Sequence, residues 1–338
     1  MNSTDKNGVL LINLGTPKSP TTSDVKTYLK EFLSDKDVIR LPRFFWIPLL
    51  NFVILRTRPA QSAELYKKVW TKWGSPLLYN TYLQAGLLKK KFEAESIDNF
   101  YVDVAMRYGS PSIESKLLQM YKTGYRKIVI VPMFPQYSTT TTRSIARKIH
   151  LVLSKNKLSD KLHINFIKDF HKNQKYIEAC CAHIKEHQTK HGKPDKLILS
   201  YHGIPESYVG DDEPYQDQCF ATSQLIAKKL DLEENNYEVA FQSRFGKAEW
   251  IKPYLAQRLE TLPDEGSKHI QVFCPGFSSD CLETIEEIGE ESCELFLESK
   301  GEKFEFIPCL NGSDKFINLV FDLVVNNEKF NTNYESLF

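Results

Sequence analysis

The residues best suited to chemistry lie in two short stretches, Leu197–Ser207 and Phe273–Glu291. The first opens on an apolar run that is typical of a buried parallel strand, and Gly203 and Pro205 stop this strand directly after His202. Open α/β sheets bind their ligands beyond the carboxyl ends of the strands, so His202 is predicted to stand at that edge. A neutral imidazole there can accept a proton or bind a borderline metal ion such as Fe²⁺.

The second stretch places carboxylates four residues apart on a predicted helix, at Glu283, Glu287 and Glu291. Steps of four residues drift by about 40° on an α-helix, whereas a π-helical turn of about 4.4 residues would nearly align them. A row of like charges costs stability, so its presence argues for a function. Stacked carboxylates at the ligand edge of a sheet suit the handling of a cation or of protons.

Structural explanations exist for the same residues. Asp280 and Glu283 occupy the N-cap and N3 positions of a possible capping box, and acidic residues stabilise a helix start. His202 can equally be a histidine at a strand end whose hydrogen bonds are satisfied. Neither explanation accounts for the excess of carboxylates beyond the one that a cap needs.

A second group of histidines recurs every four residues, at His183, His187 and His191. Histidines at this spacing can share a metal ion on a helix. Here they lie among lysines, without an acidic residue at the matching turn, and we interpret them as a solvated helix face.

Composition limits the class of protein. The chain has 338 residues, of which 41% are hydrophobic and 26% charged, as in a soluble globular protein. Its 44 basic and 43 acidic residues leave a net charge of +1, which argues against a nucleic acid as partner. Seven cysteines without paired CxxC spacing favour free thiols in a reducing cytoplasm.

No signal peptide is evident, and no apolar window reaches the length of a membrane span. The nearest is an apolar lip over Phe44–Leu55, FFWIPLLNFVIL, which contains a proline and has arginines on both sides. It is too short to span a bilayer, so we expect it to be core, a membrane-surface contact or the wall of an apolar ligand pocket.

The order of predicted elements favours an α/β fold of two similar Rossmann-like domains, each a parallel sheet of about four strands flanked by helices, with a cleft between them. The expected domains are 1–165, with the lip, and 166–312, followed by a helix and a loose tail over 313–338. Predicted strands cover 8–14, 100–106, 127–134, 163–167, 197–200, 237–242, 269–274 and 304–307. Predicted helices cover 23–33, 60–70, 81–92, 144–153, 174–190, 219–230, 248–259, 282–299 and 313–325. Neither a dinucleotide fingerprint nor a P-loop accompanies them.

Several of these stretches together resemble the ferrochelatase family, whose members insert iron into a porphyrin to make haem. The resemblance covers most of the chain from Gly8 to about Gly312, in family order. It rests on INLGTP (Ile12–Pro17), MRYGSP (Met106–Pro111), PMFPQYSTTTT (Pro132–Thr142), SYHGIPES (Ser200–Ser207), GDDEPYQDQC (Gly210–Cys219), FQSRFGKAEW (Phe241–Trp250) and CPGFSSDCLETIEE (Cys274–Glu287).

The resemblance implies a porphyrin clamped between two domains and assigns roles to residues. His202 and Glu283 match the pair that binds the metal and accepts protons. Glu287, Glu291 and Asp280 match the acidic route for metal or protons. The implied porphyrin-binding residues are Leu14, Arg107, Tyr108, Tyr137, Ser138, Trp250 and Phe277, with the apolar lip enclosing the ring.

The residue types suit the reaction that the resemblance implies. Iron cannot enter until two pyrrole protons leave, so proton acceptors must stand near the ring centre. Binding the macrocycle distorted would point its nitrogen lone pairs at the metal, with the strain offset by remote apolar contacts. Arginines could meet the propionates. The implied substrates are protoporphyrin IX and Fe²⁺. The implied location is the cytoplasm, with a peripheral position at a membrane surface as an option.

This sequence departs from the family pattern at several positions. Some members bind a [2Fe–2S] cluster through cysteines of a C-terminal extension, whereas this chain has no cysteine after Cys309, so we expect no cluster. Cys281 stands where some members have histidine. Leu14 stands where the coproporphyrin-using branch has tyrosine, which, with the apolar lip, favours protoporphyrin IX.

Two other functions remain open on the sequence alone. One is a chelatase of the same fold that uses another metal or another tetrapyrrole, such as coproporphyrin III or sirohydrochlorin. The other is a haem- or metal-binding protein without catalysis, which would need an axial ligand but no row of carboxylates.

Overall fold

A computed structural model describes residues 6–338, which divide into two compact units. Unit 1 contains residues up to Phe134, together with Ser138–Asp169 and Ile317–Phe338. Unit 2 contains Pro135–Tyr137 and Phe170–Phe316. The C-terminal segment, which the sequence analysis set apart from both domains, thus belongs mostly to unit 1.

Unit 1 is built on a sheet with the strand order β2-β1-β3-β4-β9. The four main strands are parallel, and the two-residue β9 pairs antiparallel with β4. Apolar residues fill β1 continuously, since both faces of a parallel sheet are covered. The strands are β1 (Asn7–Thr16), β2 (Phe100–Gly109), β3 (Lys127–Pro132), β4 (His163–Ile167) and β9 (Asn331–Thr332).

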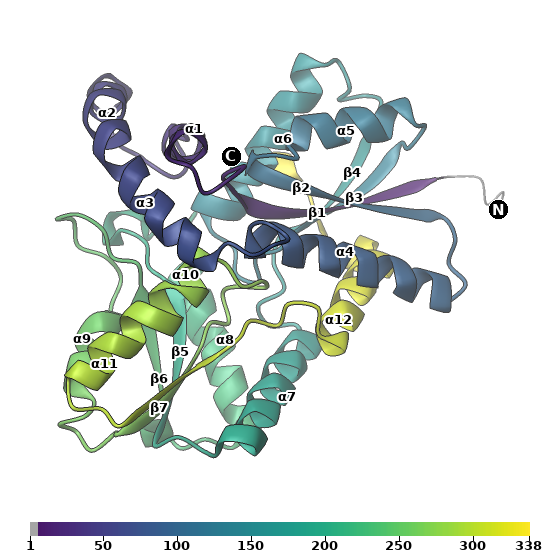
Figure 1. Ribbon diagram of the computed structural model, residues 1–338. Helices are drawn as coiled ribbons and strands as arrows, with labels where there is room; N and C mark the ends of the chain where they lie inside the picture. The colour runs from purple at the N-terminus through teal and green to yellow at the C-terminus, as the bar shows by residue number, and fades with distance from the viewer. Residues whose placement is uncertain (1–5) are drawn as a thin grey trace. The chain divides into compact units, whose positions relative to one another are not determined.

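Helices cover both faces of this sheet, as Figure 1 shows. On one face, α5 (Ile113–Lys122) and α6 (Ser144–Lys155) pack on side chains that include Leu10 and Ile12 of β1. On the other face lie α4 (Pro76–Ala94) and α12 (Asp314–Val325). A short π-helix, Thr139–Arg143, precedes α6.

The apolar lip is helical and lies in a continuous run of helix in unit 1. The run comprises α2 (Arg43–Leu49), a π-helical turn (Leu50–Ile54) and α3 (Leu55–Val69), and α1 (Thr22–Leu33) packs against α3. Within the part of the chain that the structure describes, no helix combines the length and apolarity needed to cross a bilayer.

Unit 2 holds a four-stranded parallel sheet of order β6-β5-β7-β8. Its strands are β5 (Lys196–His202), β6 (Tyr237–Gln242), β7 (His269–Phe273) and β8 (Lys303–Ile307). Figure 1 shows α7 (Gln174–His191) and α8 (Tyr215–Leu230) on one face. The other face carries α9 (Leu255–Thr261), α10 (Leu282–Ile285), a π-helix (Glu287–Ser292) and α11 (Cys293–Glu298).

The predicted α/β fold with two parallel sheets is confirmed, but three local predictions are wrong. The helix predicted over 248–259 begins only at Leu255, since Pro253 disfavours helical backbone in the residue before it. Helix α5 was not predicted at all. The tail expected to be loose contains α13 (Asn327–Phe330), β9 and a 3₁₀ turn (Tyr334–Leu337). Further 3₁₀ turns cover Glu206–Tyr208 and Glu234–Asn236.

The core of unit 1 yields a direct test of this packing. Leu10 is fully buried beneath α5 and α6, so Leu10→Ala should lower the free energy of unfolding by about 2–5 kcal/mol. Leu151 of α6 is 58% exposed. Leu151→Ala should therefore change the free energy of unfolding by less than about 0.5 kcal/mol. Urea denaturation of both variants measures the difference, and equal midpoints would contradict the described core.

Candidate active site

His202 is the last residue of β5, at the carboxyl edge of the unit 2 sheet where the sequence predicts it. Its Nδ1 lies 2.6 Å from the carbonyl oxygen of Gly203. A carbonyl can only accept, so Nδ1 carries the proton of the neutral ring and donates it to this bond. Nε2 of the neutral ring therefore keeps its lone pair for a metal ion or a proton.

Gly203 is required by the close packing around this histidine. Its N–H donates to the carbonyl of Gln242 at 2.8 Å. A Cβ at position 203 would lie 3.0 Å from that carbonyl oxygen and 3.1 Å from the ring of Trp250. Trp250 in turn lies with its ring centroid 6.4 Å from that of His202. The absence of a side chain thus lets the indole approach the strand end beside His202.

Glu287 is held by a network of donors at the end of the neighbouring strand, β6. The Ser243 N–H donates to its Oε1 at 2.6 Å, and the Ser243 hydroxyl donates to its Oε2 at 2.5 Å. Gln242 Nε2 donates to Oε2 at 3.3 Å and to the backbone carbonyl of Glu283 at 2.7 Å. Gln242 and Ser243 therefore hold the helical segment that carries Glu283 and Glu287 at the edge of the sheet.

Ser243 adopts a backbone conformation that is rare for a residue with a side chain, with φ of 64°. In this conformation both its N–H and its hydroxyl reach the same carboxylate. Backbone strain of this kind persists where surrounding interactions over-determine it, and it concentrates at functional sites.

Burial raises the pKa of Glu287 above its ordinary value, and the negative charge of Glu283 adds to this effect. Hydrogen bonds from Ser243 and the positive charge available at His202 oppose it without cancelling it. His202 and Glu283 therefore both lie near enough to Glu287 to act on its carboxyl electrostatically. A carboxyl with a raised pKa can hold a proton closer to neutral pH than an ordinary glutamate.

A π-helix covers Glu287–Ser292, the kind of turn that nearly aligns glutamates spaced four apart. The N–H of Glu291 bonds to the carbonyl of Glu286, five residues earlier, at 3.0 Å. Glu283 and Glu287 are partly buried, whereas Glu291 is exposed. The row of carboxylates therefore runs from the sheet edge outward to solvent.

Asp280 has a different environment from the other acidic residues. Its Oδ1 accepts the Cys309 N–H at 3.0 Å and the Thr284 hydroxyl at 3.2 Å, and its Oδ2 accepts Asn311 Nδ2 at 2.6 Å. The predicted capping box of Asp280 with Glu283 is wrong, because Cys281 is the N-cap and pairs with Thr284. Asp280 instead links the start of α10 to the segment after β8.

The predicted residues Arg107 and Tyr108 of unit 1 converge on a carboxylate that sequence reasoning missed, Asp35. Arg107 forms an ion pair with Asp35, and the Tyr108 hydroxyl donates to the same carboxylate at 2.8 Å. Ser144 Oγ donates to Asp35 at 2.6 Å and accepts from Arg107 Nε at 2.7 Å. Burial alone would raise the pKa of Asp35, but Arg107, Ser144 and Tyr108 lower it.

Tyr108 has no exposed surface, and burial raises the pKa of its hydroxyl well above the ordinary value. Its ring lies 4.4 Å from the Arg107 guanidinium carbon. Nearby, Asp37 pairs with Arg147 Nε at 2.7 Å and with Arg143 Nε at 3.3 Å. Two aspartates thus form ion pairs with three guanidinium groups of this region.

The other predicted porphyrin contacts differ in exposure. Tyr137 and Ser138 are buried, with exposed fractions of 4% and 2%. The Tyr137 N–H donates to Gln218 Oε1 at 2.7 Å, and Ser138 caps the π-helix that precedes α6. Leu14, Trp250 and Phe277 keep partly exposed side chains. These last three can contact a ligand without rearrangement of the fold.

The apolar lip is two-sided. Trp46, Leu50 and Leu55 are buried, whereas Phe44 is 85% exposed and Phe52 is 65% exposed. The outer side of the lip is therefore not core, which leaves a ligand contact or a surface contact among the predicted possibilities.

Sequence reasoning missed Gln242, Ser243, Asp35 and Ser144. A usable signal existed for the first two, because they end a predicted strand and start its exit loop, as His202 does in β5. Asp35 and Ser144 offered no such signal, since their contacts with β2 arise only from tertiary packing.

Two solved structures share this fold. SirB from Bacillus subtilis, solved with Fe³⁺, matches with a TM-score of 0.55 and 13% identity, covering 96% of this chain and 99% of that chain. A multi-domain protein from Deinococcus radiodurans, described as structurally similar to chelatases, matches with a TM-score of 0.53 and 10% identity over 95% of this chain and 55% of that one. At such identities the likeness concerns the fold alone, and this fold is that of the chelatases.

Sequence comparison narrows the class to one family. The family model for ferrochelatase matches residues 6–328. Ferrochelatases from Idiomarina loihiensis and Marinobacter nauticus are each 47% identical, covering 96% of this chain and 88% of those proteins. Ferrochelatase 2 from Shewanella oneidensis is 44% identical over 94% of this chain and 97% of its own. The chain belongs to the ferrochelatase family, and it is accordingly an enzyme that inserts ferrous iron into a porphyrin to form protohaem.

The raised pKa of Glu287 predicts how stability depends on pH. In the unfolded chain this carboxyl ionises near 4.5, whereas in the folded protein it does so at a higher pH. Ionisation therefore favours the unfolded state as pH rises between the two values. Glu287→Gln should be increasingly stable relative to the parent protein across this window, by about 1.4 kcal/mol for each pH unit that the window spans.

Urea denaturation of both proteins between pH 4 and 8 measures this trend. Loss of hydrogen bonds to Ser243 adds an offset that does not vary with pH, so only the slope is diagnostic. Glu294→Gln, at an exposed glutamate of α11, should show no such slope. A difference between Glu287→Gln and the parent protein that is flat with pH would contradict the assignment.

Proposed function

We propose that the chain inserts Fe²⁺ into protoporphyrin IX with release of two protons, and that His202, Glu283 and Glu287 perform the insertion. The observation that carries this proposal is the hydrogen bond from His202 Nδ1 to the Gly203 carbonyl, beside a carboxyl with a raised pKa. His202 offers a lone pair in a fixed orientation, and Glu287 offers a carboxylate that can take a proton.

The reaction exchanges two pyrrole N–H protons for one Fe²⁺ ion, so charge balances when both protons leave. The proposed first acceptor is His202, through Nε2, which becomes an imidazolium. Glu287, with its raised pKa, then relays the proton, and Glu283 stands on the same helix one turn earlier. His202 and Glu283 are also the groups proposed to contact the incoming metal ion, since imidazole and carboxylate both suit Fe²⁺.

The π-helix offers a route between this site and solvent. Glu287 is partly buried and Glu291 is exposed, so the row Glu283, Glu287 and Glu291 leads outward. Asp280 is proposed to position α10 rather than to conduct, because both of its oxygens already accept hydrogen bonds from protein donors.

Protoporphyrin IX is the porphyrin that these side chains favour. Phe44 and Phe52 offer exposed aromatic surface, and Leu14, Trp250 and Phe277 add partly exposed apolar groups. A tetrapyrrole rich in carboxylates, such as coproporphyrin III or sirohydrochlorin, would need unpaired cations. Arg107 is instead paired with Asp35, and Asp37 pairs with two further arginines of unit 1.

The exposed side of the lip is also proposed to touch a membrane surface, since the substrate is poorly soluble in water. Arg56 lies on the same helical run, with its guanidinium carbon 5.8 Å from the Phe52 ring centroid, where it could meet lipid phosphates. The proposed location is the cytoplasm, peripheral at a membrane. We expect no iron–sulfur cluster, and all seven cysteines, which lie in unit 2, are free thiols.

Loss of the His202 imidazole should abolish insertion without unfolding the protein. His202→Ala should lower kcat/KM by about 10³-fold or more, because it removes a proposed metal ligand and proton acceptor together. Fe²⁺-dependent loss of protoporphyrin fluorescence measures the rate. His150→Ala, at an exposed histidine of unit 1, is the matched control and should keep full activity. Near-normal turnover of His202→Ala would refute the proposed roles, and faster turnover of coproporphyrin III would refute the proposed substrate.

Polar substitution of the lip should weaken membrane binding selectively. The double variant Phe44→Ser and Phe52→Ser removes two exposed aromatic rings and should reduce sedimentation with anionic phospholipid vesicles several-fold. Turnover of protoporphyrin dissolved in detergent tests the ring contact separately. Phe245→Ser, at a phenylalanine of unit 2 that is 56% exposed, is the control for vesicle binding. Unchanged sedimentation of the double variant would contradict the proposed surface contact.

A further inference from the structure

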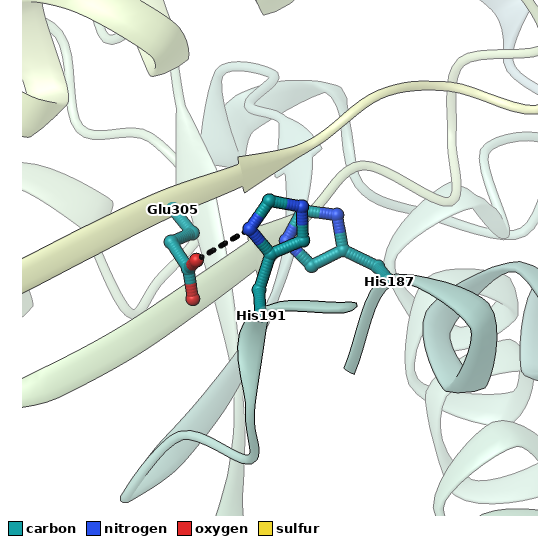
Figure 2. Close-up of side chains that lie close together, drawn as sticks. All are labelled: His187, His191 and Glu305. Carbon is teal, nitrogen blue, oxygen red and sulfur yellow. Dashed lines mark ion pairs between the residues drawn. The ribbon is translucent and has the colours of Figure 1, made fainter. Parts of the chain in front are cut away.

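A group of potential metal ligands lies in unit 2, apart from the residues proposed for insertion. His187 and His191 lie one turn apart in the last turns of α7, and Glu305 lies in β8 (Figure 2). One ligand atom from each of these residues lies within 4.8 Å of the others. The acidic partner absent from the helix itself is therefore supplied by a strand, which the interpretation of these histidines as a solvated face did not foresee.

The distances suit a small metal ion. His191 Nδ1 and Glu305 Oε1 are 3.2 Å apart. Two ligands of a tetrahedral zinc ion, each about 2.0–2.1 Å from the metal, stand about 3.3 Å apart. The imidazole rings of His187 and His191 are nearly parallel, with centroids 4.3 Å apart and an interplanar angle of 17°. Small side-chain rotations would bring all three atoms to one ion.

His187 supplies an independent sign that a partner is missing. Its Nε2 atom is buried and has no hydrogen-bond partner among the described residues. A buried polar nitrogen without a partner is costly, and a metal ion would satisfy it. Burial lowers the pKa of His187, and the neighbouring His191 lowers it further, which favours the neutral form of the ring that binds metals.

Hydrogen bonds to one oxygen of the Glu305 carboxylate fix its orientation. Its Oε2 accepts hydrogen bonds from His269 Nε2 and from Gln271 Nε2, each at 2.8 Å. Its Oε1 is left for His191, and also for Lys303 Nζ at 3.2 Å. Hydrogen bonds such as those from His269 and Gln271 commonly fix the orientation of a metal ligand in proteins. The Lys303 side chain is 46% exposed and can swing away when a cation binds.

We propose that His187, His191 and Glu305 bind one divalent transition-metal ion of the zinc type. Two imidazoles and a carboxylate with open positions for water are a donor set that zinc takes readily. This site is distinct from His202, because His269 and Lys303 begin β7 and β8, whereas His202 ends β5. The ion would fasten the end of α7 to β8, which is an edge strand of the unit 2 sheet.

Zinc binding to the full-length chain tests the proposal. Calorimetric titration with Zn²⁺ should show an equivalent that persists in His202→Ala and disappears in His187→Ala, in His191→Ala and in Glu305→Gln. His269→Ala should keep this equivalent with roughly 10-fold weaker affinity. Lys303→Gln should bind more tightly, because it removes a competing cation. Saturating Zn²⁺ should also raise Tm by roughly 5 °C in the parent protein but not in His191→Ala.

The matched control is His183→Ala, which removes a histidine of the same helix that bonds instead to the Pro308 carbonyl. It should keep the equivalent, and His191→Ala should keep normal iron insertion. Equal zinc stoichiometry and affinity in the parent protein and in His191→Ala would overturn the proposal, leaving Glu305 as an ion-pair partner only. Loss of the zinc equivalent in His183→Ala, as in His191→Ala, would overturn the proposal as well.

Discussion

The hydrogen bonds from Ser243 to Glu287 are the contact on which the candidate active site depends. They join the end of β6 to the first turn of the π-helix and, with Gln242, fix both Glu283 and Glu287 at the sheet edge. The same edge carries His202, since β5 and β6 are parallel and in register from Leu197 to His202. Without these hydrogen bonds, the Glu287 carboxylate would lose the contacts that hold it at this edge.

The burial that this fastening imposes has an electrostatic consequence. A carboxylate that accepts two hydrogen bonds from Ser243 would ordinarily have a lowered pKa, yet burial outweighs these bonds and raises the pKa of Glu287. In unit 1 the balance is reversed at Asp35, where Arg107, Ser144 and Tyr108 outweigh burial and lower the pKa. The first carboxyl is suited to exchanging protons, whereas the second is suited to staying ionised and holding its neighbours.

Much of the fold was predictable from the sequence, because buried parallel strands give unbroken apolar runs and their carboxyl ends are marked by glycine and proline. His202 was found in this way, and the acidic row was found from the spacing of its glutamates, which a π-helical turn would nearly align. The sequence could not show that Arg107 and Tyr108 share Asp35, or that Glu305 meets His191, since these contacts join residues distant along the chain. The helix predicted over 248–259 begins late, at Leu255. The prediction relied on apolar spacing and neglected the restriction that Pro253 places on the backbone of the residue before it.

The bond between His202 and the Gly203 carbonyl also limits how strongly the imidazole can hold what it captures. Histidines backed by a carboxylate become more basic and bind metals more firmly. A neutral peptide oxygen supplies no charge, so it fixes the orientation of the ring without the electrostatic support that a carboxylate would add. A histidine held in this way would bind an ion at Nε2 less firmly than one backed by a carboxylate, which suits an enzyme that must pass its metal on rather than keep it.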